Sequence, residues 1–169
     1  MTLREFWDAF WADNAPYFIG AYDNNSSDEM ISHSMWSRPN ISLESLHIHE
    51  QADLIREIER KVDGNKFTRH THEKERIFLV EENEERITLK VMTTFDGVLY
   101  SDRYQEWSKW EIFTHDPRSH QVVFRKTALI TWEYGPGKPW VVWRYIQANA
   151  EAKLASDVVG MDDWLQDSA

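Results

Sequence analysis

The sequence predicts an α+β fold in which a curved antiparallel sheet wraps around a long C-terminal helix, with a short helix at the N-terminus. First, the runs between residues 68 and 134 are rich in Thr, Ile, Val, Phe and Trp, which favour strands. Second, short polar turns separate most of these runs, and parallel neighbours would need much longer crossovers. Third, after Gly137 the apolar spacing changes from two residues to the helical repeat.

Composition and charge limit the function. The 169 residues are expected to form one domain, 1–169, with 14% aromatic residues to shape its core. A formal net charge of -10 argues against nucleic-acid binding and against strong attraction to anionic lipid. The absence of Cys excludes disulfides and thiolate chemistry, and no run in the sequence has the apolar length of a membrane span or a signal peptide. We therefore expect a soluble, cytoplasmic protein.

The chain opens with a helix signature. Thr2 and Glu5 have the spacing of a capping box, in which each side chain satisfies a backbone N–H of the first turn. The residues that follow place one apolar face at helical spacing, made of Leu3, Phe6, Trp7, Phe10 and Trp11. We expect this short helix to pack on something large.

The next segments are harder to assign. Residues 30–37 predict a first strand, which Pro39 ends. Residues 46–49 alternate like a strand, whereas the apolar residues between 54 and 62 fit a helical face. We favour a strand followed by a short helix, and a strand that continues through Arg60 stays open.

The remaining chain predicts a meander and a closing helix. The expected strands are residues 68–81, 86–94, 104–115 and 121–134. The expected final helix carries one apolar stripe of Trp143, Ile146, Ala150, Leu154, Val158, Met161 and Leu165.

Two stretches in the middle of the chain resemble the central signature of VASt domains. They are residues 93–104, TTFDGVLYSDRY, and residues 107–112, WSKWEI, in which a strand ending in threonines leads to a turn and then to alternating aromatic and polar residues. The aromatic face of the first helix, MWS at 35–37 and IQANA at 146–150 are also similar. Taken loosely, the resemblance covers nearly the whole chain.

The resemblance implies a START-like helix-grip fold that holds a lipid, above all a sterol, between the sheet and the final helix. It implies lipid transport with transient membrane contact by a non-enzymatic monomer that needs no cofactor. It also implies a place at the cytosolic face of the endoplasmic reticulum, as part of a larger protein.

A greasy ligand needs a mostly apolar wall with one or two polar groups. The expected ligand-binding residues are Trp36, Trp107, Trp110, Trp132, Trp143, Ile146 and Ala150. Ile41 and Leu43 lie in the loop after the first strand, which the resemblance makes a lid that touches the membrane. The plain alternative is that all of these side chains simply fill the core.

Two other functions stay open. His47 with His49, and His70 with His72, have the spacing of strand neighbours on one face and, with Glu73 or Glu75, suggest a metal site. We predict none, because exposed sheet faces often carry His.

A START-like enzyme would have Asp102, Tyr104, Glu111 and Glu133 for acid–base chemistry, but no catalytic set stands out among them. A protein-interaction module with a filled core is the remaining alternative.

Overall fold

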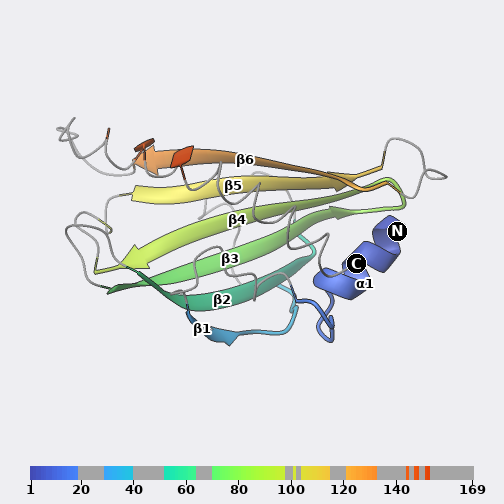
Figure 1. Ribbon diagram of the computed structural model, residues 1–169, viewed down its shortest axis with the longest axis horizontal. Coiled ribbons are helices and arrows are strands. Elements are labelled where there is room, and N and C mark those ends of the chain that lie inside the picture. The colour runs from blue at the N-terminus through green and yellow to red at the C-terminus, as the bar shows by residue number, and fades with distance from the viewer. Residues whose placement is uncertain are drawn as a thin grey trace.

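The computed structural model describes residues 1–18, 29–39, 52–63, 70–97, 101, 104–114, 121–132, 144, 147–148 and 151–152. These residues form one short helix and a six-stranded antiparallel sheet (Figure 1). The elements are α1 (Leu3–Phe10), β1 (Glu29–His33), β2 (Leu54–Asp63), β3 (His70–Glu82), β4 (Arg86–Asp96), β5 (Tyr104–Phe113) and β6 (Val123–Trp132). No helix in this part of the chain has both the length and the apolar character needed to cross a membrane.

The sheet is a meander, as predicted. Its spatial order is β1-β2-β3-β4-β5-β6, and every neighbouring pair is antiparallel. The β3–β4 connection is held by Asn83, whose side-chain oxygen accepts from the backbone N–H groups of Glu85 (2.9 Å) and Arg86 (2.8 Å). An Asn that bonds backbone groups a few residues ahead is a common way to set a tight turn, so this hairpin is fixed locally.

The predicted START-like helix-grip fold is wrong. The described residues contain one helix, the eight-residue α1, and no long C-terminal helix for the sheet to wrap around. Residues 144, 147–148 and 151–152 are helical but form no named element. The residues of the predicted apolar stripe, from Trp143 to Leu165, all lie outside the described residues.

The predicted short helix within residues 54–62 is also wrong, because these residues belong to strand β2. The alternative, a strand that continues through Arg60, is confirmed. Leu54, Ile58 and Val62 are four residues apart, and four is both about one helical turn and two strand repeats. The apolar spacing therefore fitted both structures and could not decide between them.

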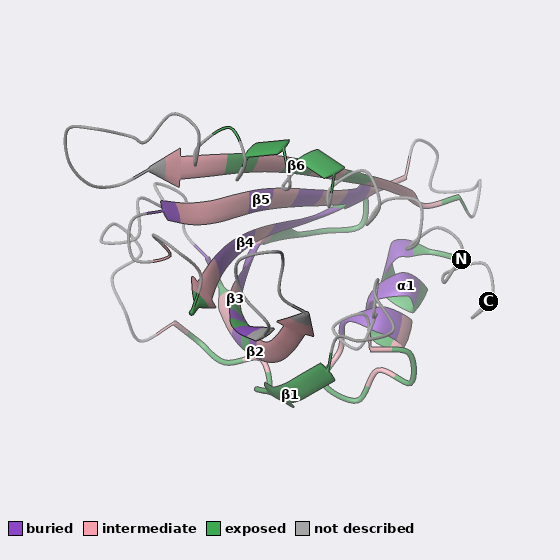
Figure 2. Cartoon of the chain, turned by 60° about the vertical axis from the view of Figure 1, so that its left-hand side comes forward, coloured by how far each residue is buried: buried purple, intermediate pink, exposed green. Residues whose placement is uncertain are grey.

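Helix α1 is confirmed in its position, its cap and its buried face. The Thr2 hydroxyl accepts from the backbone N–H of Glu5 (3.2 Å), and the Glu5 carboxylate accepts from the backbone N–H of Thr2 (2.7 Å). Leu3, Phe6, Trp7 and Phe10 are all buried. Figure 2 shows that the sheet is curved and that α1 lies on its concave side. We call this side the inner face of the sheet.

The core lies between α1 and the nearest part of the inner face. Cross-strand partners in a sheet project to the same face, so the strand register identifies the inner residues. The buried strand residues packed with α1 are Ile58, Ile77, Leu79, Ile87, Leu89, Val91, Trp110 and Ile112. Burying each such side chain contributes about 1.5–3 kcal/mol, and this cluster is the main source of stability in the described residues.

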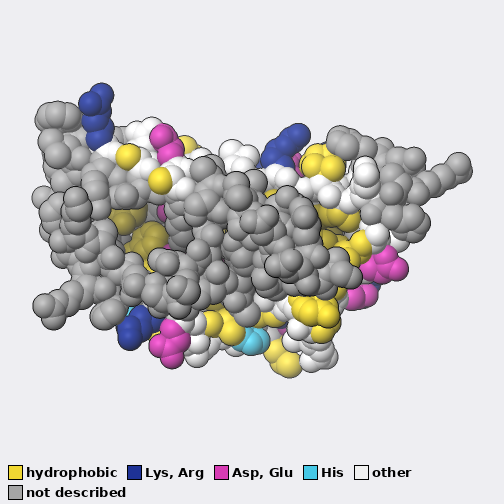
Figure 3. Space-filling view, viewed as in Figure 1, with side chains coloured by type: hydrophobic (Ala, Val, Ile, Leu, Met, Phe, Trp, Pro, Cys, Tyr) yellow, Lys and Arg dark blue, Asp and Glu magenta, His cyan; other side chains and the backbone are white. Residues whose placement is uncertain are grey.

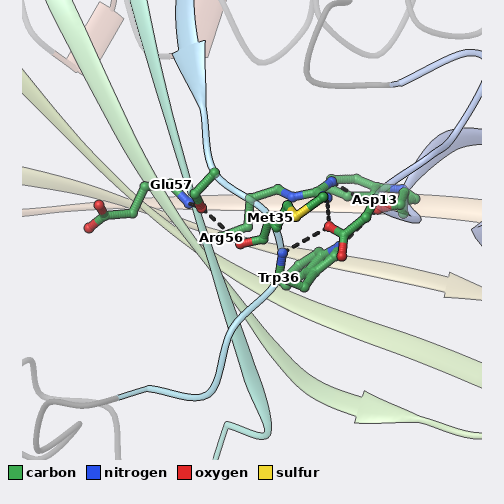
Figure 4. A network of polar contacts seen from close by, with 7 residues as sticks. Asp13, Met35, Trp36, Arg56 and Glu57 are labelled. Atoms are coloured by element: carbon green, nitrogen blue, oxygen red, sulfur yellow. Dashed lines mark hydrogen bonds and ion pairs between the residues drawn. The ribbon is translucent and has the colours of Figure 1, made fainter.

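An arginine ties the chain after α1 to the sheet (Figure 4). Arg56 is 1% exposed; its Nη1 donates to the backbone carbonyl of Trp11 (2.9 Å), and its Nη2 pairs with the carboxylate of Asp13. The Asp13 carboxylate also accepts from the backbone N–H of Trp36 (2.8 Å). The guanidinium lies over the rings of Phe18 and Trp36. Burial lowers the pKa of Arg56 and the Asp13 contact opposes that shift, so Arg56 is an internal anchor whose charge is partnered.

Candidate functional site

The inner face changes from apolar to polar along the strands. Near α1, one row across the sheet contains Leu54, Leu79, Leu89 and Trp110. The second row beyond it, moving along the strands away from α1, contains the cross-strand partners Ile58, Glu75, Thr93, Glu106 and Ile130. The polar end of the inner face is defined here as Arg60, Thr71, Glu73, Glu75, Thr93, Tyr104 and Glu106. One sheet therefore carries two different surfaces on the same side.

The polar end contains a partly buried ion-pair cluster. Nη1 of Arg60 donates to Glu75 at 2.8 Å and to Glu73 at 3.3 Å. The side chains are 16%, 13% and 2% exposed, respectively. Burial alone would lower the pKa of Arg60, but the Coulombic attraction and hydrogen bonds of the two carboxylates outweigh it and raise the pKa. The guanidinium thus stays charged and serves both carboxylates at once.

Glu75 and Thr93 are paired across β3 and β4 and have unused hydrogen-bonding capacity. Glu75 gives its Oε2 to Arg60, while its Oε1 has no hydrogen-bond partner among the described residues. The Thr93 hydroxyl has no partner in that part of the chain either, but it is not one of the buried unpaired atoms there, which are Trp11 Nε1 and Arg56 Nε. Cross-strand neighbours have Cβ atoms about 4.5–5.5 Å apart, and the Glu75 carboxylate turns to Arg60 on β2, on the other side of β3 from Thr93.

The described side chains of the polar end include more carboxylates than cations. The cation is Arg60, and the carboxylates are Glu73, Glu75 and Glu106. Burial, followed by the nearby charge of Glu106, raises the pKa of Tyr104 to about 12. Tyr104 therefore keeps its proton at neutral pH and does not act as a base. Its ring lies 6.2 Å, centroid to centroid, from that of Phe95.

Figure 3 shows hydrophobic side chains and part of an acidic one toward the left of the view, the side on which β4 ends and β5 begins in Figure 1.

Two of the predicted ligand-binding tryptophans lie on opposite faces of β5. Trp110 is on the inner face, with its ring edge-on to that of Trp11 and its Nε1 donating to the Ser108 hydroxyl (2.9 Å). Trp107 is on the outer face, where it packs with Phe78. Their spacing of three residues places them apart because successive side chains of a strand alternate. Of these two tryptophans, Trp110 is the one that can line a pocket on the inner face.

Trp36 belongs to the network around Arg56 that ties the chain after α1 to the sheet. Its ring stacks on that of Trp7 with centroids 5.4 Å apart, and its Nε1 donates to the carbonyl of Trp11 (2.8 Å). Trp132 pairs with Tyr104 in the β5–β6 register, and its side chain is outside what the structure describes. The other predicted contacts, Trp143, Ile146 and Ala150 and the lid residues Ile41 and Leu43, lie outside the described residues.

The histidine and acid–base candidates do not come together in the described residues. His72 contacts Glu59 (3.4 Å), both on the outer face, and no group of three or more metal-ligating side chains is found in this part of the chain. Nothing is described for His47, His49 and the His70 side chain, nor for Asp102 and Glu133.

Glu111 lies on the outer face among three cations. Lys109 is 3.0 Å, Arg125 3.7 Å and Arg86 4.0 Å from its carboxylate. The hydrogen bond from Lys109, with the charges of all three cations, lowers the pKa of Glu111. A carboxylate held in this ionised state on the outer face has no part in the inner site.

Sequence reasoning did not identify Arg60 and Thr93 as site residues and considered Glu75 only for a metal. The available signal was the spacing along the strand. Arg60 is two residues after Ile58, and Glu75 is two residues before Ile77, so each charge falls on the same face as a buried apolar residue. Assigning residues 54–62 to a helix concealed this relation.

Compared with models of known protein families, the chain matches none, and no curated protein matches it at a significant level.

Proposed function

We propose that this protein binds an amphiphilic lipid, foremost a sterol, on the inner face of the sheet beyond α1. The observation that carries the proposal is the change from an apolar surface to buried, hydrogen-bonding side chains along a single face. A sterol has the matching layout, a rigid apolar body with one polar group at its end. The resemblance of residues 93–104 and 107–112 to VASt domains points to the same class of ligand.

The physical basis is burial combined with orientation. Apolar area that leaves water contributes about 25 cal/mol per Å², so the apolar ring system of the sterol supplies most of the affinity. A few placed polar groups then fix which way the ligand lies. Ala128 and Ile130, which are only partly buried on the inner face of β6, offer apolar surface next to the polar end, and Glu75 and Thr93 offer the polar groups.

Lipid exchange would need transient contact with a membrane. The net charge of -10 disfavours lasting attachment to anionic bilayers, so brief contact is the mode that the charge allows. The protein then works by enclosure and release, without chemistry on the ligand.

Native mass spectrometry of the full chain, before and after addition of a sterol, tests the proposal. We expect a complex with one sterol per chain. Thr93→Leu fills the inner face with a larger side chain and should weaken binding about tenfold or more. Thr94→Leu makes the same change on the outer face and should leave binding unchanged, since neighbouring strand residues point to opposite sides. Absence of any sterol complex with the folded, unmodified chain would refute the proposal.

A further inference from the structure

We infer that the outer face of strands β4 to β6 binds a short acidic segment of a partner protein. The residues that would hold it are Arg86, Lys109, Arg125 and Leu129, which we call the outer patch. The outer patch lies on the opposite side of the sheet from the proposed lipid site, so it would give the protein a second binding surface.

Three cations of the outer patch share one carboxylate. The carboxylate of Glu111 lies 3.0 Å from the ammonium group of Lys109. It also lies 3.7 Å from the guanidinium of Arg125 and 4.0 Å from that of Arg86. Among the described residues, no other carboxylate forms an ion pair with any of these cations. One negative charge does not balance three positive ones, so the cluster attracts a further anion.

Other cations of the outer face have a carboxylate of their own. Arg76 lies 2.8 Å from Glu57, and Lys74 lies 3.5 Å from Asp96. Each of these pairs joins neighbouring strands and balances one positive charge with one negative charge. The sharing of a single carboxylate is therefore a property of the outer patch and not of the whole face.

The two arginines of the outer patch lie over one aromatic ring. Their guanidinium carbons are 6.0 Å (Arg86) and 5.4 Å (Arg125) from the ring centroid of Phe113. Their side chains are nevertheless 49% and 62% exposed. A guanidinium offers planar donors that match the two oxygens of a carboxylate. The pair is therefore suited to carboxylate groups of a partner.

The acidic β3–β4 hairpin, residues 81–85, lies beyond Arg86, at the end of the outer patch away from Leu129. Glu84 and Glu85 are exposed there. They repel an anion that approaches from the hairpin. The acidic residues of a partner would therefore meet the patch from the side of Leu129.

Leu129 adds an exposed apolar contact. Its side chain is 63% exposed, and its cross-strand partner on β5 is Trp107, which packs with Phe78. Leu129 is four residues after Arg125, so both project to the outer face, about 13 Å apart along β6. A matching partner carries carboxylates at one end and an apolar side chain about 13 Å away.

The charge of the rest of the chain favours a narrow partner. The net charge is -10, although cations outnumber the carboxylate at the outer patch. An extended anionic surface, such as a bilayer or a nucleic acid, would face this acidic surplus as well as the patch. Exposed charges act over about 8 Å at physiological salt, so a short segment can interact with the patch alone.

Fluorescence anisotropy with the full chain and a labelled peptide tests the inference. The peptide carries a run of glutamates at one end and leucines about 13 Å further along. We expect binding that weakens as NaCl is raised from about 50 mM to about 500 mM, because exposed charges are screened. A peptide with glutamine in place of glutamate should bind about tenfold more weakly. Equal binding of the two peptides would overturn the inference.

Four variants assign the binding to the outer patch. Arg125→Gln and Leu129→Ser should each weaken binding of the acidic peptide about threefold. Glu111→Gln should strengthen it about threefold, since the variant removes the carboxylate that competes with the peptide. Arg76→Gln is the control and should change nothing, because Arg76 has its own carboxylate elsewhere on the outer face. Weaker binding in Glu111→Gln, or equal losses in Arg125→Gln and Arg76→Gln, would contradict the assignment.

No sterol is present in these measurements, so a negative result would leave the proposed function standing. Failure of the folded, unmodified chain to bind the acidic peptide would overturn the inference. Sedimentation of the chain with phosphatidylserine vesicles that Arg125→Gln abolishes would also overturn it, because the outer patch would then be a membrane contact. Circular dichroism confirms that each variant is folded.

Discussion

The two ends of the inner face use the same strands for different purposes. Under α1, apolar side chains such as Leu89 and Phe10 close against one another and are almost fully buried. At the polar end, Glu75 and Thr93 are also well covered but keep hydrogen-bonding groups unused among the described residues. Under the proposed function, one end holds the fold together, while the other keeps polar groups for a ligand.

The largest effect is expected at the apolar end. Leu89→Ala should lower the free energy of unfolding by about 3 kcal/mol, since it removes transfer energy and leaves a cavity in a packed cluster. Urea unfolding measures the loss. Sterol binding should not change in the fraction that stays folded. A loss below about 1 kcal/mol would mean that this end is not the stabilising half.

The arginine anchor should have the next largest effect. Arg56→Met removes the partner of Asp13 and the donor to the Trp11 carbonyl, and we expect a loss of about 2 kcal/mol at neutral pH. Arg4→Met is the control, because Arg4 forms an exposed pair with Asp8. Its unfolding free energy should change by less than about 0.5 kcal/mol. Equal effects of the two variants would contradict the role given to the anchor.

The polar end should respond less. Thr93→Val removes a hydroxyl that has no partner among the described residues and is not one of the buried unpaired atoms there, so the free energy of unfolding should change by less than about 0.5 kcal/mol. Thermal unfolding without ligand measures the change. Thr88→Val is the matched control, because the Thr88 hydroxyl donates to Glu81 (3.2 Å) and should lose stability when removed. A clear loss for Thr93→Val would show that its hydroxyl is bonded in the folded protein.

A comparably small effect is expected at Glu111 on the outer face, away from both ends. Its pKa is lowered from the ordinary value of 4.5 in the folded state. Its stabilising contribution is therefore present above the unfolded pKa and is lost as the pH falls through the folded value. Glu111→Gln should cost about 0.5 kcal/mol at pH 7, and the difference from the unmodified chain should vanish in acid. Urea unfolding at pH 7 and pH 3 measures both values, and a difference that persists at pH 3 would argue against an ion-pair origin.

Much of the fold could be predicted because local signals agreed with it. The capping box of Thr2 and Glu5 fixed the start of α1, and Asn83 and its polar neighbours marked the β3–β4 turn. The long runs of strand-forming residues placed β3 to β6 within a few residues. Such signals depend on neighbours in sequence, so no tertiary information was needed.

The failures came where a pattern served two structures or depended on distant packing. The four-residue spacing in β2 satisfied both a helix and a strand, and the C-terminal stripe carried no information about what it packs against. The prediction of the site residues failed for a related reason. Aromatic residues were expected to line it, but Trp107 points to the outer face and Trp36 to the anchor. The inner charges of Arg60 and Glu75 were visible only once the strand register was known.

The most direct measurement compares two neighbouring threonines by NMR. Thr93 and Thr94 are adjacent in β4 and lie on the inner and outer faces, so their methyl groups report on the two sides of the sheet separately. With methyl-labelled threonine and a 3-hydroxysterol, we predict a large chemical-shift change at Thr93 and almost none at Thr94. Changes at Thr94 without Thr93, or no change at either methyl at saturating sterol, would contradict the assignment of the binding site to the inner face.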